Sequence, residues 1–125
     1  MVPSTTARID LETFSSLDNL STDPEFLVTL VAGFLRDSEE QLRLAREALG
    51  SGRLSCVHDA LHAMQGTSGS IGAVGMMRTC SDIRGRSNDQ LEHEGAALIE
   101  DLAAQLEESR ILLGQYLGDR VRPNR

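Results

Sequence analysis

His62 is the residue of this sequence best suited to chemistry, because the positions that follow it carry small side chains. Segment 60–73 reads ALHAMQGTSGSIGA, with glycine at positions 66, 69 and 72. Each glycine in a helix interior costs about 1 kcal/mol relative to alanine, so a strip of them needs a reason. A neutral imidazole offers a nucleophilic ring nitrogen at physiological pH. We therefore expect another protein surface to approach His62 closely across these small residues.

A helical projection separates His62 from the residues expected to form the core. At about 100° per residue, one stripe centred on Leu61 collects the apolar positions and one serine: Leu54, Val57, Leu61, Met64, Ser68 and Ile71. The flank between about 40° and 140° from Leu61 holds a different set: His58, His62, Gln65, Gly66, Gly69 and Ala73. The histidine is therefore expected beside the core stripe and not within it.

A metal site is the second chemistry that these histidines suggest. His58 and His62 have the spacing of the two histidines in the H-E-x-x-H zinc motif. Asp59 stands at the position of the glutamate base of that motif, and its side chain is one methylene shorter. The third histidine, His93, belongs to another expected helix, and no cysteine pair supplies further ligands. A zinc hydrolase is therefore the weakest of the hypotheses, and we expect no metal ligands.

The segment that begins at His62 resembles the motif of histidine-containing phosphotransfer (HPt) domains, which is close to H-x-L-K-G-x-S-x-x-x-G-A. The matching residues are His62, Gly66, Ser68, Gly72 and Ala73, with Met64 in place of leucine. The resemblance covers roughly residues 9 to 117 and includes the opening segments Ile9-Asp10, 23–27 and Phe34-Leu35, and the region of Cys80.

This resemblance implies a function and a set of site residues. His62 would accept a phosphoryl group and relay it between receiver-domain aspartates in a two-component phosphorelay. Gln65, where the family usually has lysine, would orient the phosphate through its amide, and a protonated His58 could add positive charge. Gly66 and Gly69 would clear space for the receiver, and Ser68 would pack inside the bundle.

The resemblance also implies which partners and cofactors to expect. The partners would be response-regulator receiver domains, a hybrid sensor kinase, or both, and the receiver alone would hold Mg²⁺. The chain would be a phosphohistidine carrier without a nucleotide site of its own, consistent with the absence of a P-loop motif. Because Gln65 lacks the charge of lysine, an HPt-like docking module that binds a receiver or an enzyme without phosphate turnover stays open as the alternative.

Composition excludes several other classes of protein. The 125 residues suffice for one domain, and the net charge of −7, with no lysine and dispersed arginines, argues against a nucleic-acid partner. No apolar run is long enough for a membrane span, and residues 1–6 lack the features of a signal peptide. Cys56 and Cys80 have neither metal-ligand nor disulfide spacing, so we expect the reducing cytoplasm as the compartment. We also expect the chain to be a monomer.

Hydrophobic periodicity predicts an all-α protein that positions His62 on its third main element. Expected helices cover residues 11–17, 25–49, 54–71, 74–83 and 89–117, with breaks at 50–52, at Gly85 and at Gly118. Asp23-Pro24-Glu25 is a typical helix start. Short connections favour an antiparallel four-helix bundle with a short extra N-terminal helix. We expect a flexible tail over 1–8, the bundle over 9–118 and a second tail over 119–125.

Overall fold

The computed structural model describes residues 8–23 and 25–121, and the helices of that part follow the predicted order. They are α1 (Leu11–Asp18), α2 (Glu25–Gly50), α3 (Leu54–Ile71), α4 (Val74–Arg84) and α5 (Asn88–Val121). No strand occurs among the described residues. The all-α prediction is therefore confirmed.

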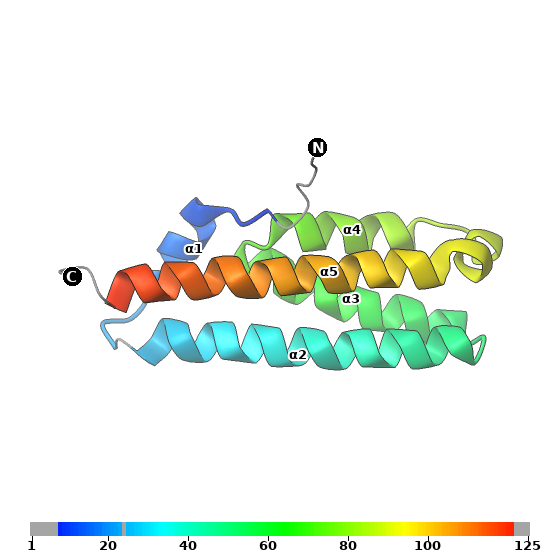
Figure 1. The fold of residues 1–125 in the computed structure, drawn as a ribbon, viewed down its shortest axis with the longest axis horizontal. Helices are drawn as coiled ribbons and strands as arrows, with labels where there is room; N and C mark the ends of the chain where they lie inside the picture. The colour runs from blue at the N-terminus through cyan, green and yellow to red at the C-terminus, as the bar shows by residue number, and fades with distance from the viewer. Residues whose placement is uncertain (1–7, 24, 122–125) are drawn as a thin grey trace.

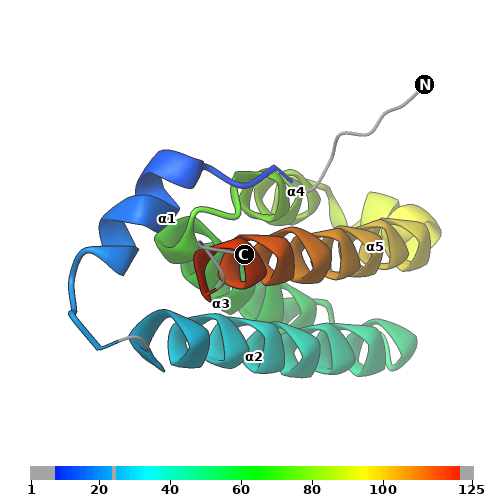
Figure 2. The same cartoon turned by 60° about the vertical axis from the view of Figure 1, so that its left-hand side comes forward.

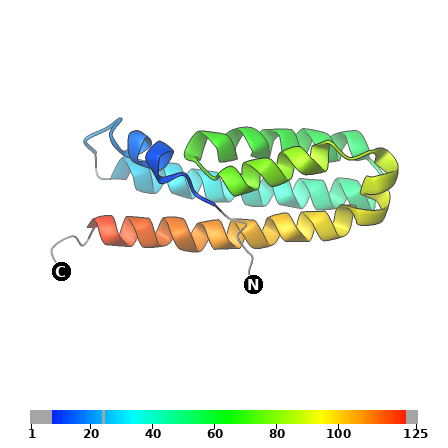
Figure 3. The same ribbon diagram turned by 90° about the horizontal axis from the view of Figure 1, so that it is seen from above.

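Helices α2 to α5 form an antiparallel bundle in which consecutive helices run in opposite directions. In Figure 1 the chain runs along α2 in cyan, returns along α3 in green, runs out again along α4 and returns along α5, which ends in red. Seen from above in Figure 3, α3 and α4 lie on one side of the bundle and α5 on the other. Helix α1 lies across the end where α2 begins and α5 ends (Figure 2). The predicted bundle with a short extra N-terminal helix is confirmed.

The core stripe predicted for the histidine helix is also confirmed. Val57, Leu61 and Met64 are fully buried, and Ser68 is buried with them. On α2 and α5, Ala48 and Ile99 are buried, and their neighbours Leu49 and Leu98 are partly buried against the core. Helix α5 also buries two polar residues, Gln105 and Ser109. The Gln105 side-chain amide donates a hydrogen bond to the Thr79 hydroxyl at 2.7 Å.

Five predicted helix ends differ from the observed ones, four of them by a single residue: α1 ends at Asp18, α2 at Gly50 and α4 at Arg84, and α5 begins at Asn88. The larger difference is at the end of α5, which continues through Gly118 to Val121. Gly118 lies inside α5 and is not among the described glycines with positive φ, which are Gly52 and Gly72. The predicted start of α2 holds at Asp23, whose carboxylate accepts a hydrogen bond from the Glu25 amide at 2.9 Å. Pro24, residues 1–7 of the predicted tail 1–8 and residues 122–125 of the predicted tail 119–125 lie outside the described residues. Residues 119–121 belong to α5.

The turn between α3 and α4 is tied to the N-terminal segment through Gly72. This glycine has φ 89°, and its carbonyl accepts a hydrogen bond from the Asp10 amide at 2.7 Å. The Gly75 amide donates in turn to the Arg8 carbonyl at 3.2 Å. A Cβ at position 72 would lie only 2.9 Å from the Asp10 carbonyl oxygen, so glycine is required for this close approach. The contact holds the C-terminal end of α3 in place.

Candidate functional site

His62 lies in the middle of α3 with its side chain exposed. Its neighbour Leu61 is 0% exposed, so the helix is anchored in the core at the residue before the histidine. Adjacent side chains on a helix point about 100° apart, and this offset turns the imidazole outward. The predicted position of His62, beside the core stripe, is confirmed.

An apolar groove of about 660 Å³ opens beside His62, and we call it the His62 groove. It lies where α1 and the first half of α2 meet the second half of α3. Its walls are mostly apolar side chains, with few polar groups and one carboxylate. The lining residues are Leu17, Phe26, Thr29, Leu30, Gly33, Phe34, Asp37, His62, Ala63, Gly66, Thr67, Ser70 and Ile71. The histidine is thus exposed at the edge of a surface suited to an apolar partner element.

The two glycines predicted to clear space for a partner occupy different surroundings. Gly66 lines the His62 groove, and a Cβ built there would meet no heavy atom within 4 Å. Gly69 instead faces α4, where a Cβ would lie 3.0 Å from the Met77 sulfur. Gly69 therefore lies outside the His62 groove, and its role in receiver docking stays a prediction. Its missing side chain allows α3 and α4 to approach each other.

Gln65 is engaged by an arginine that the sequence analysis did not single out. The Arg84 Nη1 atom donates a hydrogen bond to Gln65 Oε1 at 2.7 Å, across the interface between α4 and α3. The Arg84 Nε atom is buried and has no hydrogen-bond partner among the described residues. Burial raises the pKa of the nearby Cys80 thiol to about 12, and the positive charge of Arg84 acts against that shift. Gln65 is therefore paired with a positively charged side chain from α4.

The remaining residues of the motif have structural roles. Ser68 is buried in the core, as predicted, and its hydroxyl has no hydrogen-bond partner among the described residues. Gly72 ends α3 in the left-handed conformation, and the Ala73 amide donates to the Ser68 carbonyl at 2.8 Å. Ala73 itself is fully buried. These positions fix the end of the helix that presents His62.

His58 lies one turn before His62 and is half-buried outside the His62 groove. It has no hydrogen-bond partner within the described part of the chain. His93 is remote on α5, where its Nδ1 atom contacts the Asp89 carbonyl at 2.8 Å. Across residues 8–23 and 25–121, no group of three or more histidine, cysteine or acidic side chains is arranged to hold a metal ion.

Comparison with known protein families identifies the chain. The model of the Hpt domain matches residues 29–110, which is more than half of the sequence and includes His62. The chain belongs to the Hpt domain family. Hpt domains are the histidine-containing phosphotransfer domains of phosphorelays, so the chain is a histidine phosphotransfer protein, as the motif predicted.

A solved structure supports the same assignment. The bundle is similar to the crystal structure of histidine-containing phosphotransfer protein B from Pseudomonas aeruginosa, with a TM-score of 0.80. The two sequences are 26% identical, and the match covers 91% of this chain and 97% of that chain. A search of the curated proteins found no match. Among the described helices, none combines the length and the apolar character that a membrane span requires.

Proposed function

We propose that His62 is the phosphoacceptor of this Hpt protein and that receiver domains dock on the His62 groove. The supporting observation is that the motif histidine is exposed at the edge of an apolar groove while Leu61 and Met64 anchor α3 in the core. Phosphoryl transfer depends mainly on positioning, and a histidine fixed on a rigid helix meets that requirement.

The transfer step involves one bond formed and one bond broken. The lone pair of an unprotonated ring nitrogen of His62 attacks the phosphorus of an aspartyl phosphate on the receiver. The nitrogen–phosphorus bond forms as the acyl oxygen–phosphorus bond breaks, and the bonding electrons remain on the aspartate carboxylate. The reverse step passes the group to a second receiver. In this proposal the receiver supplies Mg²⁺, and the bundle needs no cofactor of its own.

The His62 groove suits one apolar element of a receiver. Phe26, Leu30 and Ile71 provide the apolar walls, and Gly66 leaves the floor beside the histidine uncovered. We propose that the protein acts as a monomer, because this face must be free for each partner in turn. We also propose the cytoplasm as its compartment, which is supported by its two free cysteines.

Phosphate transfer from a purified receiver tests the proposal. Receiver domains from the same genome would be phosphorylated with acetyl phosphate and Mg²⁺ and mixed with the wild-type protein. Transfer should label the wild type with acid-labile phosphohistidine and leave His62→Gln unlabelled. Since His62 is exposed, the variant should melt within a few degrees of the wild type. Equal labelling of a folded His62→Gln protein would refute the assignment of the acceptor.

The same assay separates phosphotransfer from docking without turnover. The docking-module alternative arose because Gln65 lacks a positive charge, but the bond from Arg84 places a charge next to that amide. This observation favours turnover. A wild-type protein that binds a phosphorylated receiver in calorimetry and never acquires phosphate would instead support the docking module.

A further inference from the structure

Arg84 is the cation most closely associated with the motif that carries His62. Its guanidinium donates to Gln65 Oε1 at 2.7 Å. Gln65 follows His62 by three residues, and side chains with this spacing on a helix are neighbours, with about 5–6 Å between their Cβ atoms. The guanidinium is therefore bound to the side chain that neighbours His62 on α3, and neither Gln65 nor Arg84 lines the His62 groove.

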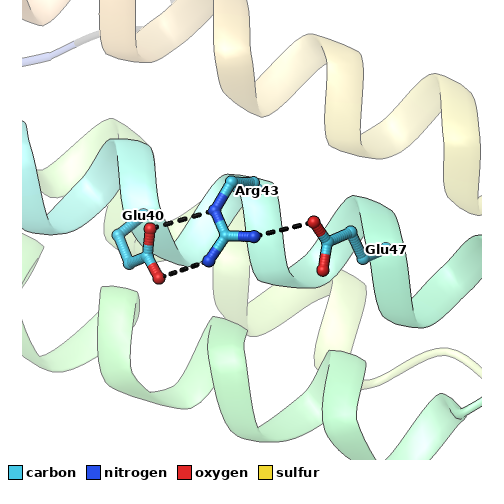
Figure 4. A network of polar contacts seen from close by, with 3 residues as sticks. All are labelled: Glu40, Arg43 and Glu47. Atoms are coloured by element: carbon cyan, nitrogen blue, oxygen red, sulfur yellow. Dashed lines mark hydrogen bonds and ion pairs between the residues drawn. The ribbon is translucent and has the colours of Figure 1, made fainter.

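The charge of Arg84 is not neutralised, unlike the charges of most other described arginines. Arg43 is held between Glu40 and Glu47 at 2.6 and 2.7 Å, as Figure 4 shows. Other arginines of the described residues also contact carboxylates: Arg36, Arg46, Arg86 and Arg110. Arg84 contacts the neutral amide of Gln65 instead. A hydrogen bond donated to an amide oxygen orients a guanidinium and leaves its positive charge available to an anion.

A phosphoryl group on His62 creates the anion that such a cation would meet. The group adds negative charge to a protein whose formal net charge is already −7, and the chain has no lysine to compensate it. Arg84 still has donor groups beyond the one given to Gln65, because a guanidinium carries five N–H donors. Guanidinium groups match phosphate oxygens in geometry as well as in charge.

We propose that Arg84, oriented by Gln65, binds the phosphoryl group on His62 and stabilises the phosphorylated form of the protein. The inference rests on the proposed function, since it requires a phosphohistidine at position 62. It assigns Gln65 a positioning role: the amide aims Arg84 and does not itself supply the charge. Arg84 comes from α4, so the site spans two helices.

The equilibrium of phosphate transfer measures this role directly. Wild-type protein and a receiver phosphorylated with acetyl phosphate would be mixed, and the ratio of phosphohistidine to phosphoaspartate would be read once it stops changing. This ratio among the free proteins depends on the stability of each phosphorylated form and not on how tightly the two proteins dock. Arg84→Gln should lower the ratio about tenfold at low salt, the size expected for loss of a charge-assisted hydrogen bond.

Two further variants separate charge from structure. Arg78→Gln makes the same change on the same helix, at an exposed arginine on the wall of a different pocket, and should leave the ratio within twofold of wild type. Gln65→Lys combined with Arg84→Gln moves the charge from α4 to α3 and should recover most of the lost ratio. Melting curves would verify that each variant folds. The effect of Arg84→Gln should also shrink in about 1 M salt, where the Debye length is roughly 3 Å.

The outcomes distinguish this inference from the proposed function. If wild type is labelled and Arg84→Gln has the same ratio as wild type or as Arg78→Gln, the role of Arg84 is refuted and His62 remains the acceptor. The same conclusion follows if the double variant folds and recovers nothing. If no phosphorylated receiver labels the wild type, the proposed function fails and the role of Arg84 fails with it.

Discussion

Replacing Gly66 and Gly69 separately by leucine tests the division of α3 into a partner-facing side and a packed side. The two glycines are three residues apart on the same helix, so the gain in helix propensity is nearly the same for both changes, about 1 kcal/mol. They differ in what the new side chain meets. At position 66 it enters the open His62 groove, and at position 69 it meets Met77 on α4.

The expected effects therefore differ in sign. Gly66→Leu should raise the free energy of unfolding by up to about 1 kcal/mol, or the melting temperature by about 4 °C. Gly69→Leu must displace the Met77 side chain, and overpacking of this kind costs about 1–3 kcal/mol. Because the propensity terms cancel, Gly69→Leu should be less stable than Gly66→Leu by about that amount. Receiver binding should be impaired by the variant that is the more stable of the two. Gly66→Leu should weaken receiver docking at least tenfold, or by about 1.4 kcal/mol.

Urea denaturation of both variants and calorimetry with a receiver that labels the wild type provide the measurements. Wild-type affinity in a folded Gly66→Leu protein would show that receivers do not use the His62 groove. Equal stability of the two variants would contradict the packing of Gly69 against α4. Because both variants replace glycine by leucine on the same helix, comparing them removes the effect of helix propensity.

Three further changes test the packing that supports the site. Gly72→Ala should lower stability by more than about 1–2 kcal/mol in urea denaturation, because φ 89° disfavours alanine and the new Cβ would press on the Asp10 carbonyl. Ser68→Ala removes a buried, unpaired hydroxyl and should leave the unfolding free energy unchanged or raise it by up to about 1 kcal/mol. Burial raises the pKa of Cys80 from 9.0 to about 12, so native protein should react with a thiol reagent only at Cys56. Because the unfolded thiol ionises first, wild type should lose stability relative to Cys80→Ala as the pH rises from 9 towards 12.

The sequence was sufficient to predict the architecture, because each helix carries its own periodic pattern. The stripe through Val57, Leu61 and Met64 predicted which side of α3 is buried, and His62 then had to face outward. The ends of the helices were less predictable. Gly118 is a residue type that often ends a helix, yet α5 continues to Val121, and Gly118 does not adopt the left-handed conformation typical of a glycine cap.

The surroundings of two site residues could not be predicted from the sequence, because a second helix determines them. A helical projection places Gly69 and Gln65 on the same flank as His62, and that placement holds in the structure. The projection does not include α4, which covers this flank through Met77 and Arg84. Gly66 is farther around the helix and is not covered by α4, so the same residue type lines an open groove at one position and packs against a neighbouring helix at the other.

Arg84 illustrates why a missing charge in a motif does not imply a missing charge in a site. Gln65 departs from the family pattern in a way that, along the sequence, removes the cation beside the phosphate. In three dimensions the amide accepts a hydrogen bond from a guanidinium nineteen residues later, on the next helix. The signal in the sequence was indirect: a chain without lysine must meet its needs for positive charge with arginine or histidine. Because an amide aims a guanidinium without neutralising it, the substitution relocates the charge from α3 to α4.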